Sequence, residues 1–174
     1  CITAVNWRLQ PAEVAYIVAD SDAKVLFASA KLADLAGEVA AELADSAPAY
    51  VAFGGAVDGY GSYDELLSAT TRLDDKPRGS ATLYSSGTTA RPMGIKPALL
   101  PIQVDQPGDP ITGLIQHVFK AGESDVYLSP APMYHAAPLK WSGAIHALGG
   151  TVVVMEKFDA EELLVAVEKY KVTI

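Results

Sequence analysis

Short apolar runs alternate with segments of helical period along this chain, and this alternation restricts the possible folds more than any other feature. Residues 24–28 are typical of a buried strand, whereas the apolar side chains of residues 10–19 recur at helical spacing. Strands that alternate with helices favour parallel pairing, because each helix returns the chain to the same end of the sheet. We therefore expect an α/β fold, with a layered, largely parallel sheet and flanking helices.

The expected elements cover most of the chain. Strands are predicted over residues 24–28, 50–53, 81–85, 125–128 and 151–155. Helices are predicted over residues 10–19, 32–43, 136–148, within 107–122, after Ser62 and after Asp159. The helix within 107–122 has an apolar side made of Ile111, Leu114, Ile115 and Val118. Ser62 with Glu65, and Asp159 with Glu162, have the spacing of helix-capping pairs. The stretches 72–80 and 96–110 are interpreted as loops within one domain.

Composition excludes several classes of protein. Half of the 174 residues are hydrophobic, but no apolar run approaches the roughly 18 residues that a membrane-spanning helix needs. The net charge is −8, and the 13 basic residues form no long cluster, which argues against a nucleic-acid or anionic-membrane surface. The single cysteine excludes an internal disulfide framework and suits a cytoplasmic protein.

The most informative segment is YSSGTTARPMG, residues 84–94. Its hydroxyl side chains and its glycine, which lets the backbone approach a ligand closely, are features that a phosphate group requires. It is not a Walker A loop, because no Gly-Lys-Ser/Thr sequence occurs. From composition alone, a solvated surface loop is the commoner alternative.

The order of these residues resembles the signature of the adenylate-forming ligases, in which the loop closes over the β- and γ-phosphates of ATP. The resemblance implies that phosphates are contacted by Ser85, Ser86, Gly87, Thr88 and Thr89. It also places Arg91 and Gly94 in the nucleotide-binding set and gives Ser85 a possible part in holding Mg²⁺.

The segment departs from the family signature at two positions. Ala90 replaces a glycine and Met93 replaces a lysine. The methionine removes a cation that would offset the charge of departing pyrophosphate. Arg91 could supply that charge instead, or its side chain could face solvent. Lys96 is expected on the opposite face of the strand from Met93, because their separation is odd.

A second resemblance lies at residues 129–135, SPAPMYH, between a predicted strand and a predicted helix. Acyl- and aryl-CoA synthetases carry a Pro-x-aromatic-His segment here, which implies that Tyr134 and His135 border the carboxylate substrate. The alternative for His135 is a capping or packed histidine. Leu139 and Trp141 follow and could wall an acyl tunnel, but Trp141 could equally be ordinary core.

The resemblance covers the whole chain and implies a partial N-terminal AMP-binding domain over residues 1–174, part of an acyl-CoA synthetase that uses ATP, Mg²⁺, coenzyme A and a fatty or similar carboxylate. The chain begins at Cys1 and stops at Ile174, where a strand is expected to begin. Both ends are therefore expected to be cuts through a longer protein, without the family's C-terminal domain and with a sheet edge near Thr173 that favours association. The alternative is a non-catalytic nucleotide-binding or interaction module.

Other motifs are set aside. The sequence around Tyr60 and Gly61 is similar to a later adenine-binding motif of the family, but it precedes the phosphate loop and is interpreted as a turn and a helix cap. The three histidines are not at close metal-ligand spacings, and no G-x-S-x-G nucleophile elbow occurs.

Overall fold

The computed structural model describes residues 1–44, 48–68, 73–85 and 91–174. They form two compact α/β units, each described here by itself. The first contains Cys1–Ala4, Pro77–Leu83 and Pro97–Ile174, and the second contains Val5–Lys76 and Tyr84–Lys96. The chain leaves one unit and enters the other at several points. Two of these points, Lys76–Pro77 and Lys96–Pro97, lie in the stretches that the sequence predicts as loops. The other two points lie at Ala4–Val5 and, inside a strand, at Leu83–Tyr84.

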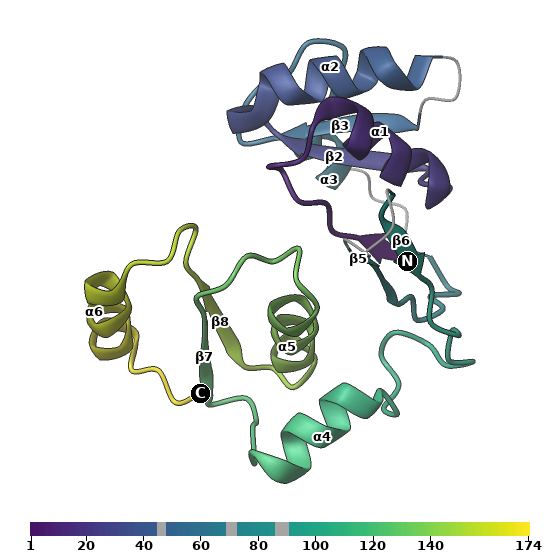
Figure 1. Ribbon diagram of the computed structural model, residues 1–174. Helices are drawn as coiled ribbons and strands as arrows, with labels where there is room; N and C mark the ends of the chain where they lie inside the picture. Colours follow the sequence, from purple (N-terminus) through teal and green to yellow (C-terminus); the bar gives the residue numbers. More distant parts are fainter. Residues whose placement is uncertain (45–47, 69–72, 86–90) are drawn as a thin grey trace. The chain divides into compact units, whose positions relative to one another are not determined.

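The second unit contains a parallel sheet with helices packed against it (Figure 1). Its strands are β2 (Val25–Ser29), β3 (Ala49–Phe53) and β4 (Gly61–Ser62). Its helices are α1 (Pro11–Asp20), the short 3-10 helix η1 (Ala30–Leu32), α2 (Ala33–Leu43) and α3 (Tyr63–Leu67). Strands β2 and β3 pair along their full length, with Val25 opposite Ala49, and β4 continues the parallel order.

Local sequence explains where α1 begins and which face it buries. Gln10 is the N-cap residue, its backbone N–H donates to the Glu13 carboxylate at 2.9 Å, and Pro11 occupies the first turn. Val14 and Val18 are buried with Val39 of α2 in one core cluster. The predicted apolar face of this helix is therefore confirmed.

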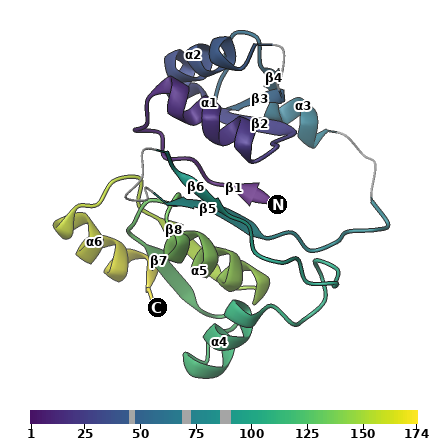
Figure 2. The ribbon, with the colours of Figure 1, turned by 45° about the vertical axis from the view of Figure 1, so that its right-hand side comes forward.

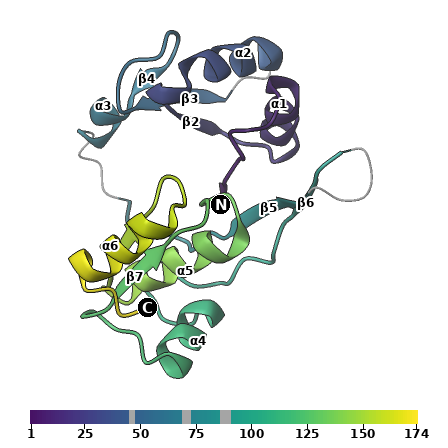
Figure 3. The same cartoon turned by 60° about the vertical axis from the view of Figure 1, so that its left-hand side comes forward.

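The first unit is built on the parallel pair β7 (Val126–Ser129) and β8 (Thr151–Val154). Its helices are α4 (Pro110–Val118), α5 (Ala136–Ala147) and α6 (Ala160–Tyr170). Helices α5 and α6 lie on opposite sides of the pair (Figures 1 and 3). The core combines Ile115 of α4 with Ile145 of α5, and both side chains are fully buried.

Two helix predictions in this unit have different outcomes. Asp159 caps α6 by accepting hydrogen bonds from the backbone N–H groups of Glu161 and Glu162, as predicted. Helix α4 lies within the predicted stretch 107–122, but its apolar side is buried unevenly, because Leu114 and Val118 are 51% and 62% exposed. Ile115 belongs to the core cluster and Ile111 packs against it.

A further sheet has the order β1-β5-β6, formed by β1 (Ile2–Thr3), β5 (Ala81–Ser85) and β6 (Met93–Ile95) (Figure 2). Strand β5 is parallel to β1, with Ile2 opposite Ala81. Its residues to Leu83 belong to the first unit, whereas Tyr84 and Ser85 belong with β6 to the second. The predicted fold class is confirmed, with the parallel pairing spread over three small sheets.

The last two residues continue the sheet of the first unit. The backbone N–H of Thr173 donates to the carbonyl of Val126 at 2.9 Å, and that of Leu128 donates to the carbonyl of Ile174 at 3.0 Å. Thr151 of β8 and Met155 directly after it instead donate to the carbonyls of Asp125 and Ser129, so residues 173–174 lie along the other edge of β7. No helix among the described residues is long and apolar enough to cross a bilayer.

Candidate functional site

The predicted phosphate-binding segment lies between two strands, β5 before it and β6 after it, and residues Tyr84–Lys96 belong to the second unit. Ser85 and Arg91, which stand at its two ends, are exposed. Met93 is 64% exposed and begins β6. The remaining predicted contacts, Ser86, Gly87, Thr88 and Thr89, and the substituted Ala90 lie outside the described residues.

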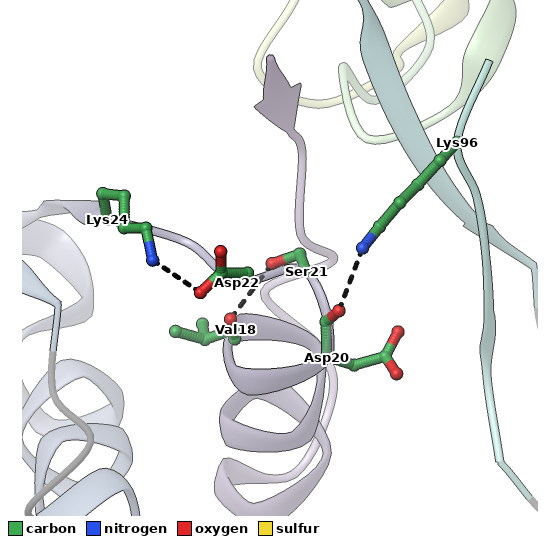
Figure 4. Close-up of polar contacts among 6 residues, drawn as sticks. All are labelled: Val18, Asp20, Ser21, Asp22, Lys24 and Lys96. Carbon is green, nitrogen blue, oxygen red and sulfur yellow. Dashed lines mark hydrogen bonds and ion pairs between the residues drawn. The ribbon is translucent and has the colours of Figure 1, made fainter. Parts of the chain in front are cut away.

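Both framing strands are hydrogen-bonded to one residue, Asp20, at the end of α1. The phenol of Tyr84 donates to the Asp20 carboxylate oxygen Oδ2 at 2.6 Å. The Lys96 ammonium donates to the backbone carbonyl oxygen of Asp20 at 3.2 Å (Figure 4). Tyr84 directly precedes Ser85, and Lys96 directly follows β6, so the two bonds hold the entry and the exit of the loop.

These contacts have a clear electrostatic basis. Burial raises the pKa of the Tyr84 phenol well above its ordinary range, and the hydrogen bond to Asp20 and the charge of that residue raise it further. The phenol therefore stays protonated and remains a donor at physiological pH. The Lys96 cation lies at the carboxyl end of α1, where the helix dipole is negative.

Two predicted nucleotide-binding residues contact aromatic rings of this unit. A Cβ added at Gly94 would lie 2.8 Å from the ring carbon Cζ of Tyr84, so the glycine leaves room for that ring. The guanidinium of Arg91 lies over the ring of Tyr16, 5.5 Å from its centroid. Tyr16 is one helical turn before Asp20. Helix α1 therefore contacts the loop region through Tyr16 and, one turn later, through Asp20. Nucleotide binding by Arg91 and Gly94 stays a prediction.

The second predicted segment follows β7 in the first unit and is attached to buried groups. Ser129 is completely buried, and its hydroxyl contacts the sulfur of Met133 at 3.8 Å. The hydroxyl of Ser142, on α5, reaches the same sulfur at 3.7 Å. Strand β7 and helix α5 thus both contact Met133, the residue before Tyr134.

The predicted carboxylate-binding residues differ in exposure. The rings of Tyr134 and His135 are adjacent, with centroids 4.7 Å apart. His135 occupies the N-cap position of α5, but its side chain makes no capping hydrogen bond, and it is exposed. Its ring is therefore available to a ligand, although a substrate contact stays a prediction.

The predicted tunnel residues lie on α5. Leu139 is partly buried. Trp141 packs against the core cluster and makes ring contacts with Phe119 at 4.9 Å and Tyr127 at 5.9 Å. This placement corresponds to the core alternative for Trp141, and a role in an acyl tunnel remains a proposal.

Three further observations concern the cap of α3, possible metal ligands and Asp20. Ser62 caps α3 by accepting from the backbone N–H of Glu65, as the interpretation of a turn and cap requires. Among the described residues, no group of three or more His, Cys, Asp or Glu side chains could hold a metal ion. Sequence reasoning missed Asp20, because its separation of 64 positions from Tyr84 leaves no local spacing to detect.

The comparisons with known proteins agree on one family. The family model described as AMP-binding enzyme matches residues 1–174. An indoleacetate–CoA ligase of Aromatoleum aromaticum is 32% identical over 98% of this chain and 33% of its own length. A 3-hydroxybenzoate–CoA ligase of another Aromatoleum is 37% identical over 53% of this chain and 18% of its own.

Solved structures show the same fold. A candidate long-chain-fatty-acid CoA ligase of Rhodopseudomonas palustris superposes with a TM-score of 0.76 at 23% identity, over 97% of this chain and 42% of that one. A red-emitting luciferase of Phrixothrix hirtus superposes with a TM-score of 0.74 at 19% identity, over 97% and 34%. The chain spans about a third of the curated relative that it matches along nearly all its length.

Proposed function

This chain belongs to the family of AMP-binding enzymes, and from that premise we propose that it supplies the ATP-phosphate-binding part of an acid–CoA ligase. The observation that carries the proposal is the strand–loop–strand arrangement with Ser85 and Arg91 exposed at its two ends. Residues 85–94 include no acidic side chain, which favours a polyanionic ligand.

The proposed reaction activates a carboxylate in two steps. A carboxylate oxygen attacks the α-phosphorus of ATP, the bond to the bridging oxygen of the β-phosphate breaks, and pyrophosphate leaves. The thiolate of coenzyme A then attacks the acyl carbon and releases AMP. In the first step the loop hydroxyls and backbone N–H groups hold the phosphates and Arg91 contacts the nucleotide, but Met93 supplies no cation to offset the charge of the departing pyrophosphate. When bound, Mg²⁺ neutralises phosphate charge, and Ser85 is the proposed contact for it.

The carboxylate is proposed to lie beside Tyr134 and His135, with Leu139 and Trp141 toward its apolar part. The names of the relatives, indoleacetate–CoA ligase and 3-hydroxybenzoate–CoA ligase, add aromatic acids to the fatty acids that the sequence resemblance implies. A panel of both classes, tested in an enzyme of full family length that carries this segment, distinguishes them by carboxylate-dependent pyrophosphate exchange.

The direct test uses the chain itself. We expect it to bind ATP with Mg²⁺ in equilibrium titrations, with inorganic pyrophosphate as a competitor. We also expect no exchange of radiolabelled pyrophosphate into ATP above a no-protein control, because the family's downstream adenine and metal motifs do not occur in these residues. Carboxylate-dependent exchange by the chain would contradict the second expectation, and a lack of ATP binding would contradict the proposed function.

A second candidate is a module that binds nucleotide weakly, or only partner proteins, without catalysis. The observation in its favour is Met93, an exposed apolar side chain where the family has a lysine. Turnover in the enzyme of full family length would decide against this candidate.

We also propose that the sheet edge at residues 173–174 promotes self-association and that the protein acts in the cytoplasm. Light scattering at increasing concentration tests the first proposal, and a sharp monomer peak at high concentration would contradict it. Imaging of the tagged protein in its own cell tests the second.

A further inference from the structure

We infer that Asp20 is a positioning residue for the phosphate-binding loop, and that it sets the entry and the exit of that loop from a single point on α1. The inference rests on the proposed function for its ligand. Its geometric part, the attachment of both framing strands to Asp20, stands on contacts within the second unit.

The attachment uses two different groups of the same residue. The Asp20 side chain accepts from Tyr84 at 2.6 Å, and its backbone carbonyl accepts from Lys96 at 3.2 Å. Any movement of this helix end therefore shifts both ends of the loop together. The Tyr84 ring also lies close against Gly94 on the neighbouring strand. A Cβ added at Gly94 would lie only 2.8 Å from the ring carbon Cζ.

The surroundings distinguish Asp20 from the next acidic residue, Asp22. The Asp22 carboxylate pairs with Lys24 at 2.6 Å, and both side chains are more than three-quarters exposed. Figure 4 shows this pair and the Lys96 contact at the same end of α1. The Asp22 side chain is bonded to its near neighbour in sequence, whereas Asp20 bonds to residues of β5 and to the residue after β6. Asp22 is therefore a matched control for the loss of an acidic group at this place.

A positioning role predicts an effect on phosphate binding with little effect on stability. The Tyr84–Asp20 bond is exposed, so its loss should leave the thermal unfolding of the chain nearly unchanged. It should instead weaken the binding of ATP, whose β- and γ-phosphates contact the loop. AMP lacks those phosphates, and its affinity should not change.

The first experiment is a double-mutant cycle on the chain, with MgATP and AMP as the probes. Asp20→Ala and Tyr84→Phe should each lower the affinity for MgATP by roughly fivefold, and the double variant should lose no more than either single one. Asp20→Asn retains an oxygen acceptor for the phenol and should recover most of the affinity. Asp22→Asn should bind as the unaltered chain does. Losses that multiply in the double variant, or that are equal for AMP, would overturn the inference.

The second experiment needs no nucleotide. In hydrogen exchange, the amides of β5 and β6 should exchange several-fold faster in Asp20→Ala and Tyr84→Phe than in Asp22→Asn. Unchanged exchange in these strands would overturn the inference even if ATP binds. If exchange is faster as expected but the unaltered chain does not bind ATP, the attachment stands and the proposed function fails.

Discussion

The two segments that carry the candidate chemistry are attached to the protein in different ways. The strands on either side of the phosphate-binding loop are joined to α1 by exposed polar contacts, those of Tyr84 and Lys96 with Asp20. The segment that leads to His135 in the first unit is attached to buried groups, including Ser129, which has no exposed surface, and Ser142.

The two kinds of attachment are expected to affect different properties: the position of the ligand-binding loop in one case and the stability of the fold in the other. An exposed hydrogen bond contributes little to the free energy of unfolding, but it can fix the direction of a strand. A buried contact contributes much more, because its loss leaves a cavity or an unpaired polar group. Substitutions near the loop should therefore alter ligand binding and rate, whereas substitutions behind the His135 segment should first alter folding.

The largest effect is expected in the core of the first unit. Ile145→Ala should lower the free energy of unfolding by about 2–5 kcal/mol, because Ile145 is completely buried and its truncation leaves a cavity. Urea unfolding followed by Trp141 fluorescence, in a Trp7→Phe background, measures the change. Leu164→Ala is the control, since that side chain is 68% exposed and should cost well below 1 kcal/mol. Equal losses of unfolding free energy in Ile145→Ala and Leu164→Ala would contradict the view that burial stabilises this part of the first unit.

The next effect concerns the cation at the loop. In an enzyme of full family length that carries this segment, Met93→Lys should accelerate adenylation with little change in carboxylate affinity. A transition-state contact to the leaving pyrophosphate is worth on the order of 2.7–4 kcal/mol, so the gain could reach roughly a hundredfold. Ala90→Gly should add to the gain if the loop must close over the phosphates. Pyrophosphate release measures the rate.

The competing possibility is that Arg91 already supplies this charge, although it lies over Tyr16 in the structure. Arg91→Ala would then abolish the reaction, and Met93→Lys would change little. That pair of results would exclude the assignment to Met93.

A smaller effect is expected at the glycine beside Tyr84. Gly94→Ala should destabilise the second unit by about 1–3 kcal/mol, because the new methyl group overlaps the Tyr84 ring. Gly37→Ala, in helix α2 with nothing within 4 Å of the added carbon, should instead stabilise by roughly 0.5–1 kcal/mol. Urea unfolding followed by Trp7 fluorescence, in a Trp141→Phe background, measures both. Stabilisation by both alanines would show that the ring is not confined.

The smallest effect tests electrostatics in the first unit. Burial of Asp109 would raise the pKa of its carboxyl, but the hydrogen bonds from Thr112 and the charge of Arg78 outweigh it and hold the pKa below its ordinary value of 3.8. Since the folded pKa is the lower one, the carboxylate stabilises the fold above pH 3.8, and this contribution is lost as pH falls through the folded pKa. Asp109→Asn keeps the helix cap and should cost below about 1 kcal/mol at pH 7.

Unfolding at pH 7 and at pH 3 checks this expectation. The difference between Asp109→Asn and the unaltered chain should shrink at the lower pH. Arg78→Met, which removes the ion-pair partner at 3.4 Å, should show a smaller loss in the same direction. If the difference in unfolding free energy between Asp109→Asn and the unaltered chain grew at low pH, the carboxylate would not be stabilising in the predicted direction.

Sequence reasoning predicted local features where the physical cause is itself local. The caps at Ser62 and Asp159 follow from side chains that reach backbone N–H groups within one turn. The buried face of α1 follows from helical period alone. The burial along α4 could not be predicted, because period shows which residues share a face but not how much of that face is covered, and Leu114 and Val118 are exposed.

The sequence by itself determined the fold class, the family and the position of the loop, because alternation, period and the order of the SSGTT residues are properties of neighbouring positions. Only the tertiary structure decided that Asp20 bonds to Tyr84 of β5 and to Lys96 after β6, that Gly94 makes room for a ring, and that Trp141 packs against the core cluster. The reason is physical: these contacts join segments brought together by burial of other side chains. Nothing in the spacing of two residues that are 64 positions apart records that they will meet.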